Sequence, residues 1–218
     1  MKSDLILAQI VAALTTDGHL QLDSRRGVIS FYSKSIESID YFNNLFNEYF
    51  NVKGRIFRDT RGKNEKYKLF IANKKLAIFL KDKETPVGNK TKCSYVLPSW
   101  VKQGNKKVKS AYLRMVFDCE GSIFSGADRR WRLTYTMNKG ESLRQNGILF
   151  LEEMRRMLNE FGIFTSNIWI SKDNIRKDGS NSLQFKFEVK KISFANFSKN
   201  IGFLDKSKLE RLNLALSS

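Results

Sequence analysis

The sequence predicts an α+β fold in which one unit, made of helix, hairpin, helix, hairpin and helix, occurs twice. Three pairs of similar segments follow one another in the same order along the chain. They are residues 10–18 and 113–121, residues 46–52 and 158–164, and residues 69–79 and 185–194. Self-similarity of this kind marks a repeated structural unit, and the growing offset within the pairs indicates insertions in the second copy.

A boundary between the two copies is expected where the composition changes. Both prolines of the chain, Pro86 and Pro98, fall in a stretch rich in Lys, Asn and Gly. Such a composition is typical of turns and linkers. We therefore expect a first unit at residues 1–85, a linker at 86–106 and a second unit at 107–218.

In the first unit, apolar spacing predicts the elements in order. Apolar residues from Leu7 to Leu14 recur at intervals of three and four, which predicts an amphipathic helix that Gly18 ends. The same spacing predicts a second helix from about Ile36 to Phe50. Alternating segments predict hairpins at residues 19–33 and 54–72, and a short helix at 73–82 closes the unit.

The second unit repeats this order. Helices are expected at about 108–119, up to about 161, from 190 onward, and at 204–216, with hairpins around residues 128–130 and 172–181. Apolar residues alternate with polar ones from Trp131 to Met137 and from Ser182 to Val189. Each sheet should therefore place one apolar face against helices and leave a polar face open.

The charge of the chain predicts a polyanionic partner. Lys and Arg number 39 against 22 Asp and Glu, a formal net charge of +17. The basic residues are spread over strands and turns rather than along one amphipathic helix, which favours nucleic acid over a membrane surface. No apolar run approaches the roughly 20 residues that span a bilayer.

The scarcity of cysteine and histidine excludes several mechanisms. Cys93, Cys119 and His19 are the whole supply, too few for a disulfide framework or a Cys/His zinc site. Histidine-based hydrolysis is equally hard to build. We expect an intracellular protein, and a composition rich in Lys, Asn, Ile and Phe is compatible with an organelle, a phage or a prokaryote of AT-rich genome.

Basic and polar side chains on the open sheet faces and in the hairpin turns are the expected nucleic-acid ligands. Those expected to bind DNA are Arg25, Arg26, Lys66, Lys68, Arg129, Arg130, Arg132, Thr134, Thr136, Gln184 and Lys186. Further basic residues of the turns are Arg61, Lys63, Arg176 and Lys177.

Two expected helices end in an acidic residue followed by glycine. They are "IVAALTTDG", with Asp17, and "LRMVFDCEG", with Glu120. If the two helices pack together, mostly small residues line the seam: Ala8, Ala12 and Thr16 from one, Ala111, Met115 and Cys119 from the other. Carboxylates at a helix C-terminus face a negative field, so a cation is expected beside them. Hard oxygen ligands next to phosphate suit Mg²⁺.

These two segments resemble the paired LAGLIDADG motifs of homing endonucleases in their single-chain form. The resemblance implies a pseudo-twofold pair of αββαββα units, with two sheets forming a saddle over DNA and the motif helices at the interface. It also implies a monomer that cleaves both strands of a long target with Mg²⁺, leaving 3′ overhangs. Asp17 and Glu120 would be the catalytic acids and metal ligands, joined by backbone oxygens of Thr16 and Cys119. Lys34 and Lys139 would be further catalytic residues.

The second motif departs from the family pattern at two positions. Met115 stands where the motif prefers glycine, and Arg114 replaces a small residue, so its side chain should reach solvent or DNA. Asp118 lies on a side of the helix turned away from the seam and is expected to be structural.

Two other functions remain open. Glu188 and Lys190, with Asp173 or Asp178, imitate another nuclease pattern, but that leaves the duplication unexplained. A chain of this fold can also act as an intron maturase that binds intron RNA, or as a non-cleaving DNA-binding protein. The presence of both acids favours cleavage of an intron- or intein-type target.

Overall fold

The structure is a computed structural model, and it describes residues 2–60, 66–175 and 181–218. By their contacts the described residues form two compact units. Unit 1 holds residues 1–89 and 98–112, and unit 2 holds residues 90–97 and 113–218. None of the helices described is both long and apolar enough to cross a bilayer.

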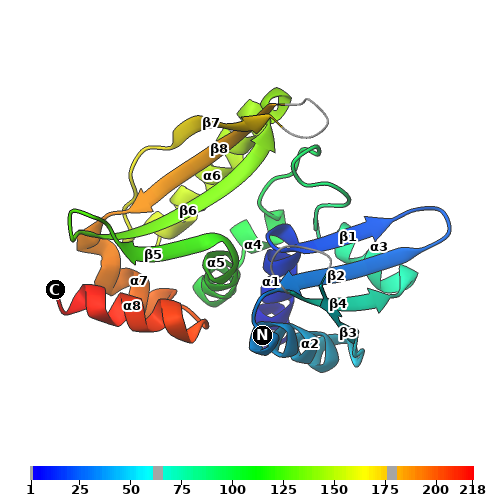
Figure 1. Cartoon of the computed structure of the whole chain (residues 1–218). Coiled ribbons are helices and arrows are strands. Elements are labelled where there is room, and N and C mark those ends of the chain that lie inside the picture. Colours follow the sequence, from blue (N-terminus) through cyan, green and yellow to red (C-terminus); the bar gives the residue numbers. More distant parts are fainter. Residues whose placement is uncertain (1, 61–65, 176–180) are drawn as a thin grey trace. The chain divides into compact units, whose positions relative to one another are not determined.

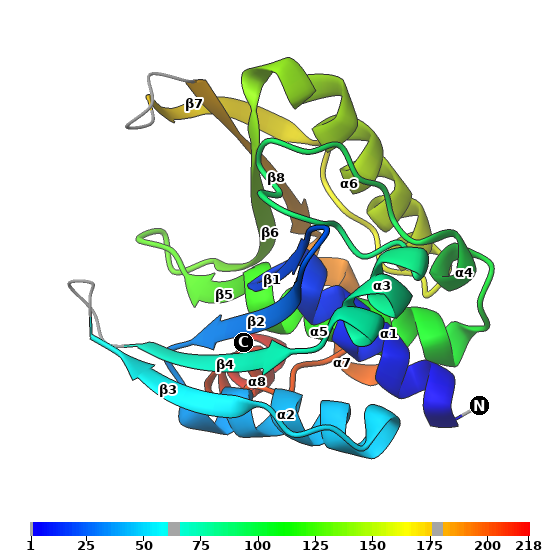
Figure 2. The same ribbon diagram turned by 90° about the vertical axis from the view of Figure 1, so that its right-hand side faces the viewer.

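Unit 1 contains a four-stranded antiparallel sheet in the order β1-β2-β4-β3, called sheet A below. Figure 2 shows α2 lying along one face of sheet A. The elements, seen in Figure 1, are α1 (Lys2–Thr15), β1 (Gly18–Leu22), β2 (Gly27–Ser33), α2 (Ile36–Phe50), β3 (Arg55–Asp59), β4 (Lys66–Ala72), α3 (Lys74–Asp82) and α4 (Ser99–Lys102).

Unit 2 contains a second four-stranded antiparallel sheet, sheet B, in the order β5-β6-β8-β7. Its first helix, α5, begins in the part of the chain grouped with unit 1 and ends in unit 2. The elements are α5 (Lys106–Glu120), β5 (Gly121–Ser125), β6 (Trp131–Gly140), η1 (Glu141–Leu143), α6 (Arg144–Asn159), β7 (Trp169–Ile175), β8 (Asn181–Val189), η2 (Lys191–Ser193), α7 (Phe194–Asn200) and α8 (Lys206–Leu216).

The two sheets share one topology and one register, which confirms the predicted duplication. Gly18 pairs with Phe31 in sheet A, and Gly121 pairs with Tyr135 in sheet B. Ile29 pairs with Ile71 in the first, as Leu133 pairs with Val189 in the second. Counting along each second strand from these pairs, Phe31 corresponds to Tyr135. The expected α+β class and element order are therefore confirmed.

Aromatic residues build the core of each unit. In unit 1 the ring of Phe42, from α2, lies 4.4 Å from that of Phe31 in sheet A and 5.0 Å from that of Phe46. In unit 2, the ring centre of Phe117 of α5 lies 5.0 Å from that of Phe197 of α7 and 5.8 Å from that of Tyr135 of sheet B. Such pairs bind helices to one face of each sheet beyond the gain from burial alone.

The predicted linker at residues 86–106 does not form a separate segment. Residues 90–97 belong to unit 2, because Asn146 of α6 bonds both the N–H and the C=O of Tyr95, at 3.3 and 2.9 Å. Residues 98–112 belong to unit 1, where the Trp100 indole donates to the carbonyl of Lys83 at 3.1 Å. Most of this stretch is loop, as its composition indicated, but it also contains the short helix α4, and hydrogen bonds hold it to the flanking units.

Candidate functional site

The two predicted acids occupy the same place in the two repeats. Asp17 stands in a two-residue turn between α1 and β1, and Glu120 is the last residue of α5. Asp17 is exposed and Glu120 is half-buried. Each is followed at once by the first residue of a strand, Gly18 of β1 or Gly121 of β5. Both carboxylates are thus placed where a rigid helix turns into a rigid sheet.

Close backbone approach explains the glycine after each acid. A Cβ at Gly18 would lie 2.8 Å from the Cα of Leu14, and one at Gly121 would lie 2.9 Å from the Cα and 2.5 Å from the carbonyl oxygen of Phe117. Neither glycine is among those with positive φ. These glycines end the helices by letting the strand start against the last helical turn, which a side chain would block.

At the end of α1, threonine hydroxyls satisfy the carbonyls of the last turns. Thr15 donates to the carbonyl of Val11 at 2.8 Å, and Thr16 donates to those of Ala12 and Ala13 at 2.9 and 3.2 Å. Both threonines are buried. Neutral hydroxyl groups of the helix's own sequence thus bond carbonyls near the helix end that precedes Asp17.

At the end of α5, a lysine from α8 takes this role. The Lys208 ammonium donates to the carbonyls of Phe117, Asp118 and Gly121, the last at 2.7 Å. Three carbonyls thereby acquire a cation from a distant part of the sequence, and a cation at a helix C-terminus is electrostatically favourable.

Asp118 also ties α5 to the segment around α8, here through its own side chain. Its carboxylate accepts the backbone N–H groups of Leu204, at 2.9 and 3.0 Å, and Asp205, at 3.0 Å. Burial raises the pKa of the Asp118 carboxyl, while these two amides act to lower it. Asp118 is thus structural, as predicted.

Arg114 was expected to reach solvent or DNA, and its side chain is indeed only half-buried. Its Nε donates to the carbonyl of Ile201. The half-buried side chain ties α5 to the end of α7, where a backbone acceptor is available.

The two predicted lysines have different environments. Lys34, just after β2, is exposed. Lys139, in β6, has no exposed surface, and its ammonium donates to the carbonyls of Lys90 at 3.0 Å and Cys93 at 2.8 Å. The ammonium also lies 3.4 Å from the centre of the Tyr95 ring. Burial lowers the pKa of Lys139 to about 8.

This geometry corrects the catalytic assignment of Lys139. It follows Leu133, Tyr135 and Met137 on the helix-facing side of sheet B, because side chains in a strand alternate between faces. By the shared register, the residue that corresponds to Lys34 is Asn138, which is exposed. The sequence could have shown that Lys139 is buried, because strand alternation places it on the same face as the apolar residues Leu133, Tyr135 and Met137.

The outer face of sheet B, opposite its helices, is mostly polar. Thr136 pairs with Lys186 and Asn138 pairs with Gln184 across the central strands. Trp169, which is 61% exposed, lies beside Lys186 and was not predicted as a site residue. Its position in an alternating strand next to polar residues is the sequence signal that could have identified it.

Thr134 departs from its prediction as a DNA-contacting residue. It lies on the outer face of sheet B but is only 3% exposed, so in this structure it offers almost no surface to a ligand. Its place between Ser122 and Glu188, on the neighbouring strands, accounts for part of this cover.

The outer face of sheet A is more aromatic than that of sheet B. Lys68 places its ammonium 5.5 Å from the ring centre of Tyr32 and 5.2 Å from that of Phe70. Phe57, 47% exposed, packs edge-on against Phe70 with ring centres 6.3 Å apart. A shallow pocket is lined by Phe57, Lys68 and Phe70 together with Arg58, Asp59 and Thr60. Apart from Lys68, the sequence reasoning did not single out this group.

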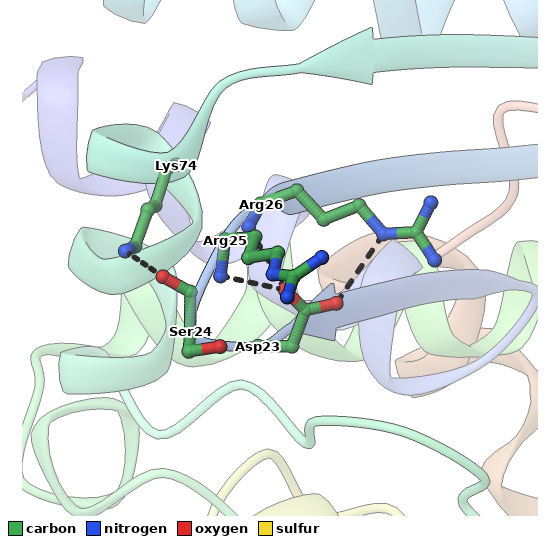
Figure 3. A network of polar contacts seen from close by, with 5 residues as sticks. All are labelled: Asp23, Ser24, Arg25, Arg26 and Lys74. Atoms are coloured by element: carbon green, nitrogen blue, oxygen red, sulfur yellow. Dashed lines mark hydrogen bonds and ion pairs between the residues drawn. The ribbon is translucent and has the colours of Figure 1, made fainter.

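The β1–β2 turn is held in one shape by Asp23, as Figure 3 shows. One carboxylate oxygen accepts the backbone N–H groups of Arg25 and Arg26, both at 2.9 Å, and these bonds lower the pKa of the Asp23 carboxyl. The other oxygen accepts Nε of Arg26 at 3.3 Å. Lys74 donates to the carbonyl of Ser24 at 2.7 Å. The turn therefore presents Arg25 and Arg26 on a fixed backbone.

The remaining predicted DNA ligands are at the surface of their own unit. Lys66, Arg129 and Arg130 are exposed, while Arg132, paired with Asp128 at 2.8 Å, and Lys186, paired with Glu188 at 3.2 Å, are half-buried. Four predicted turn residues, Arg61, Lys63, Arg176 and Lys177, lie outside the described residues.

The predicted seam residues differ in burial. Ala8 and Ala12 have no exposed surface, Thr16 is 7% exposed and Met115 is 4% exposed. Ala111 and Cys119 are half-buried. That these two sets pack against each other stays a prediction.

The donor set at the two helix ends fits a hard divalent cation. Each end offers one carboxylate and adjoining backbone oxygens, which are ligands that Mg²⁺ accepts. In the described part of the chain, no three His, Cys, Asp or Glu side chains gather into a metal cluster. An ion held here would need water or phosphate for its remaining positions, as is usual for Mg²⁺.

Comparisons with known proteins agree with the duplication. A family model described as a LAGLIDADG-like domain matches residues 4–83 and again residues 107–202. The chain is 29% identical over 211 residues to glutamine–fructose-6-phosphate aminotransferase of Methanocaldococcus jannaschii, covering 97% of this chain and 17% of that protein. It is 30% identical over 188 residues to tRNA-splicing ligase RtcB of Pyrococcus furiosus, covering 78% and 18%. It thus spans less than a fifth of the length of these relatives.

Solved structures share the fold at low identity. The crystal structure of I-DmoI in complex with DNA and Mn matches with a TM-score of 0.59 and 17% identity, covering 91% of this chain and 97% of that one. The homing endonuclease I-WcaI bound to its DNA recognition sequence gives 0.62 and 11%, covering 94% and 86%. Full-length DUF199/WhiA from Thermatoga maritima gives 0.56 and 15%, covering 99% and 60%.

The two family matches cover most of the chain, and each contains one helix that ends in an acid and a glycine, followed by the same sheet. The chain belongs to the family of LAGLIDADG-like domains and carries two of them.

Proposed function

We propose that this protein is a site-specific endonuclease that makes a Mg²⁺-dependent double-strand break in a long, asymmetric DNA target and leaves 3′ overhangs. The observation that carries the proposal is the repeated helix end, with Asp17 in one unit and Glu120 in the other. One carboxylate from each unit matches a substrate with two scissile phosphates. The DNA complexes of I-DmoI and I-WcaI, which share the fold, support this interpretation.

The helix ends fix the catalytic groups for this reaction. The carboxylates of Asp17 and Glu120, with backbone oxygens of Thr16 and Cys119, would hold Mg²⁺, which supplies charge stabilisation and a more acidic bound water. Gly18 and Gly121 let each strand start close against the end of its helix, which places each acid at that junction. Lys34, exposed at the end of β2, is the basic residue that we expect beside the phosphate.

The outer faces of the two sheets are the proposed DNA-binding surfaces. A +17 chain gains affinity from phosphate contacts and counterion release, and Arg25, Arg26, Arg129 and Arg130 stand on exposed hairpin turns for this purpose. Side chains within the strands, such as Gln184 and Lys186, have the chemistry to read base edges. We propose that the protein binds DNA as a monomer, within a cell.

The relatives support a mobile element as the source of this sequence. An aminotransferase and an RNA ligase have no catalytic chemistry in common, yet each contains a segment similar to nearly the whole or most of this chain. The similar segment occupies under a fifth of each protein, so its presence does not depend on their activities. An inserted homing endonuclease of the intein or intron type accounts for this distribution.

Cleavage of the uninterrupted target tests the proposal. A plasmid carrying the two sequences that flank this reading frame, joined without the insertion, should be linearised by the protein with Mg²⁺ and spared with EDTA. A matched plasmid with the insertion in place should stay intact. Failure to cut the joined sequence, with the folded protein shown to bind it, would overturn the nuclease assignment.

A second function within the same fold is binding without cleavage, in regulation of DNA or in splicing of intron RNA. The similarity in fold to WhiA is the observation that favours this second function. Gel-shift titrations of the uncut plasmid fragment and of the intron transcript separate these cases, because a maturase should prefer the transcript and a regulator the duplex.

A further inference from the structure

The C-terminal helix α8 lies outside both family matches yet contacts the motif helix of unit 2. The second match ends at residue 202, and α8 spans Lys206–Leu216. Its inner side is buried through Leu212 and Ala215. Arg211 donates to the carbonyl of Ile123 in β5 at 3.4 Å. The helix is therefore packed onto the strand that begins directly after Glu120.

Lys208 contacts the backbone on both sides of Glu120. Its ammonium donates to the carbonyls of Phe117 and Asp118 before the acid and to that of Gly121 after it, the last at 2.7 Å. These bonds tie the final turn of α5 and the start of β5 to the same ammonium group. The Glu120 backbone between them has little freedom to move.

A second set of bonds holds Lys208 in place. Asp205 caps α8 by accepting the backbone N–H of Lys208 at 2.8 Å. The chain before the helix is tied to α5, because the Asp118 carboxylate accepts the N–H groups of Leu204 and Asp205. We call the four residues Asp118, Leu204, Asp205 and Lys208 the α5 clamp.

The clamp also changes the charge beside Glu120. The carbonyl end of a helix carries about half a negative charge, which opposes a carboxylate on its last residue. A lysine ammonium bonded to those same carbonyls offsets this field. Because the Lys208 side chain is half-buried, its bonds to these carbonyls are less screened than they would be in open water.

We propose that Lys208 is a positioning residue for the proposed nuclease: from α8 it fixes the end of α5 and so sets the geometry and metal affinity of Glu120. The inference rests on the proposed function. It adds a residue and an element that lie outside the LAGLIDADG-like match.

Three variants test the role of Lys208. Lys208→Met removes the ammonium but keeps the length of the stem. Lys208→Arg keeps a cation able to donate to several carbonyls. Lys206→Met, an exposed position in the first turn of the same helix, is the matched control for charge loss. Each is measured on the joined-site plasmid for the rates of nicking and linearisation across Mg²⁺ concentration, for DNA affinity by gel shift, and for melting temperature.

Lys208→Met should raise the Mg²⁺ concentration for half-maximal cleavage by roughly tenfold, the loss typical when a group that orients a metal ligand is removed. Nicked plasmid should accumulate, because only one acid is displaced. Lys208→Arg should recover most of the metal dependence, and Lys206→Met should match wild type.

A Lys208→Met protein with wild-type Mg²⁺ dependence and no excess of nicked product overturns the inference, whatever its melting temperature. So does a loss that Lys206→Met shares equally with Lys208→Met, since that would reflect net charge alone. A wild-type protein that binds but never cuts the joined site instead overturns the proposed function, and the inference with it.

Discussion

Each of the two motif helices is followed by a strand that begins with glycine, but different groups bond the carbonyls at their ends. At the end of α1, the hydroxyls of Thr15 and Thr16 bond carbonyls of their own helix. At the end of α5, the Lys208 ammonium comes from a helix almost ninety residues further along the chain. The two copies thus share the order of helix, acid, glycine and strand, but they differ in the groups that bond the carbonyls at the helix end.

The outer faces of the two sheets differ in the same manner. Sheet A carries Tyr32, Phe57 and Phe70 around Lys68. The corresponding face of sheet B carries hydrogen-bonding side chains such as Thr136 and Gln184. Two faces of equal register and unequal chemistry are suited to two unlike half-sites rather than to a palindrome.

The largest expected effect tests whether the two acids are equivalent. Asp17→Asn and Glu120→Gln should each lower the cleavage rate more than about 100-fold, above the loss for groups that only orient a ligand. DNA affinity measured without metal should not fall, because a carboxylate near phosphate is repelled. If either variant cuts at the wild-type rate, that acid is not in the site.

The glycines come next, and here the two repeats should differ in degree. The Cβ of alanine at Gly121 would lie 2.5 Å from the Phe117 carbonyl oxygen, whereas at Gly18 the shortest distance to backbone is 2.8 Å, to the Cα of Leu14. Gly121→Ala should lower the free energy of unfolding by about 1–3 kcal/mol, the usual cost of overpacking, and Gly18→Ala by less. Urea unfolding of both variants measures the order, and the reverse order would contradict it.

A smaller effect tests the two sheet faces. Phe57→Ala should weaken binding by up to about 10-fold, and it should do so only where the half-site carries thymine methyl groups, which apolar side chains contact. Replacing thymine by uracil in that half-site should reproduce the loss in the wild-type protein. Gln184→Ala, the matched change on sheet B, should be insensitive to uracil. Equal sensitivity of both variants would remove the distinction between the faces.

The last expected effect concerns Lys139, whose side chain is buried and which adjoins the exposed Asn138 in β6. Its folded-state pKa is lowered to about 8 from 10.5, so the folded protein holds the proton less tightly than the unfolded chain. The cost of burying the ammonium is therefore present below pH 8 and declines as pH rises from 8 toward 10.5.

Chemical unfolding at about pH 7 and about pH 9.5, on either side of the lowered pKa, measures this dependence. The free energy of unfolding of wild type, relative to Lys139→Met, should rise between the two pH values. A constant difference between the two proteins would show that Lys139 does not titrate in this range.

The alternation of apolar and polar residues in β6 already predicted that the Lys139 side chain lies on the buried face of sheet B. From Trp131 to Met137 every second residue of β6 is apolar, and the same period puts residue 139 on the helix-facing side. Lys34 and Lys139 both lie near the end of the second strand of their unit, and this similar position led to the prediction of a shared catalytic role. The register of the hairpins decides the question, because it makes Lys34 and Asn138 corresponding positions.

The sequence by itself determined the duplication, the order of helices and hairpins, and the two helix ends with Asp17 and Glu120. These follow from local periodicity and from short motifs, which depend on residues near one another in the chain. Only the tertiary structure decided what holds those ends: the α5 clamp, the Arg114 bond to Ile201 and the anchoring of residues 90–95 by Lys139. Each joins a side chain to backbone N–H or C=O groups tens of residues away, and nearly every residue possesses these groups, so no pattern of side chains along the sequence predicts the contact.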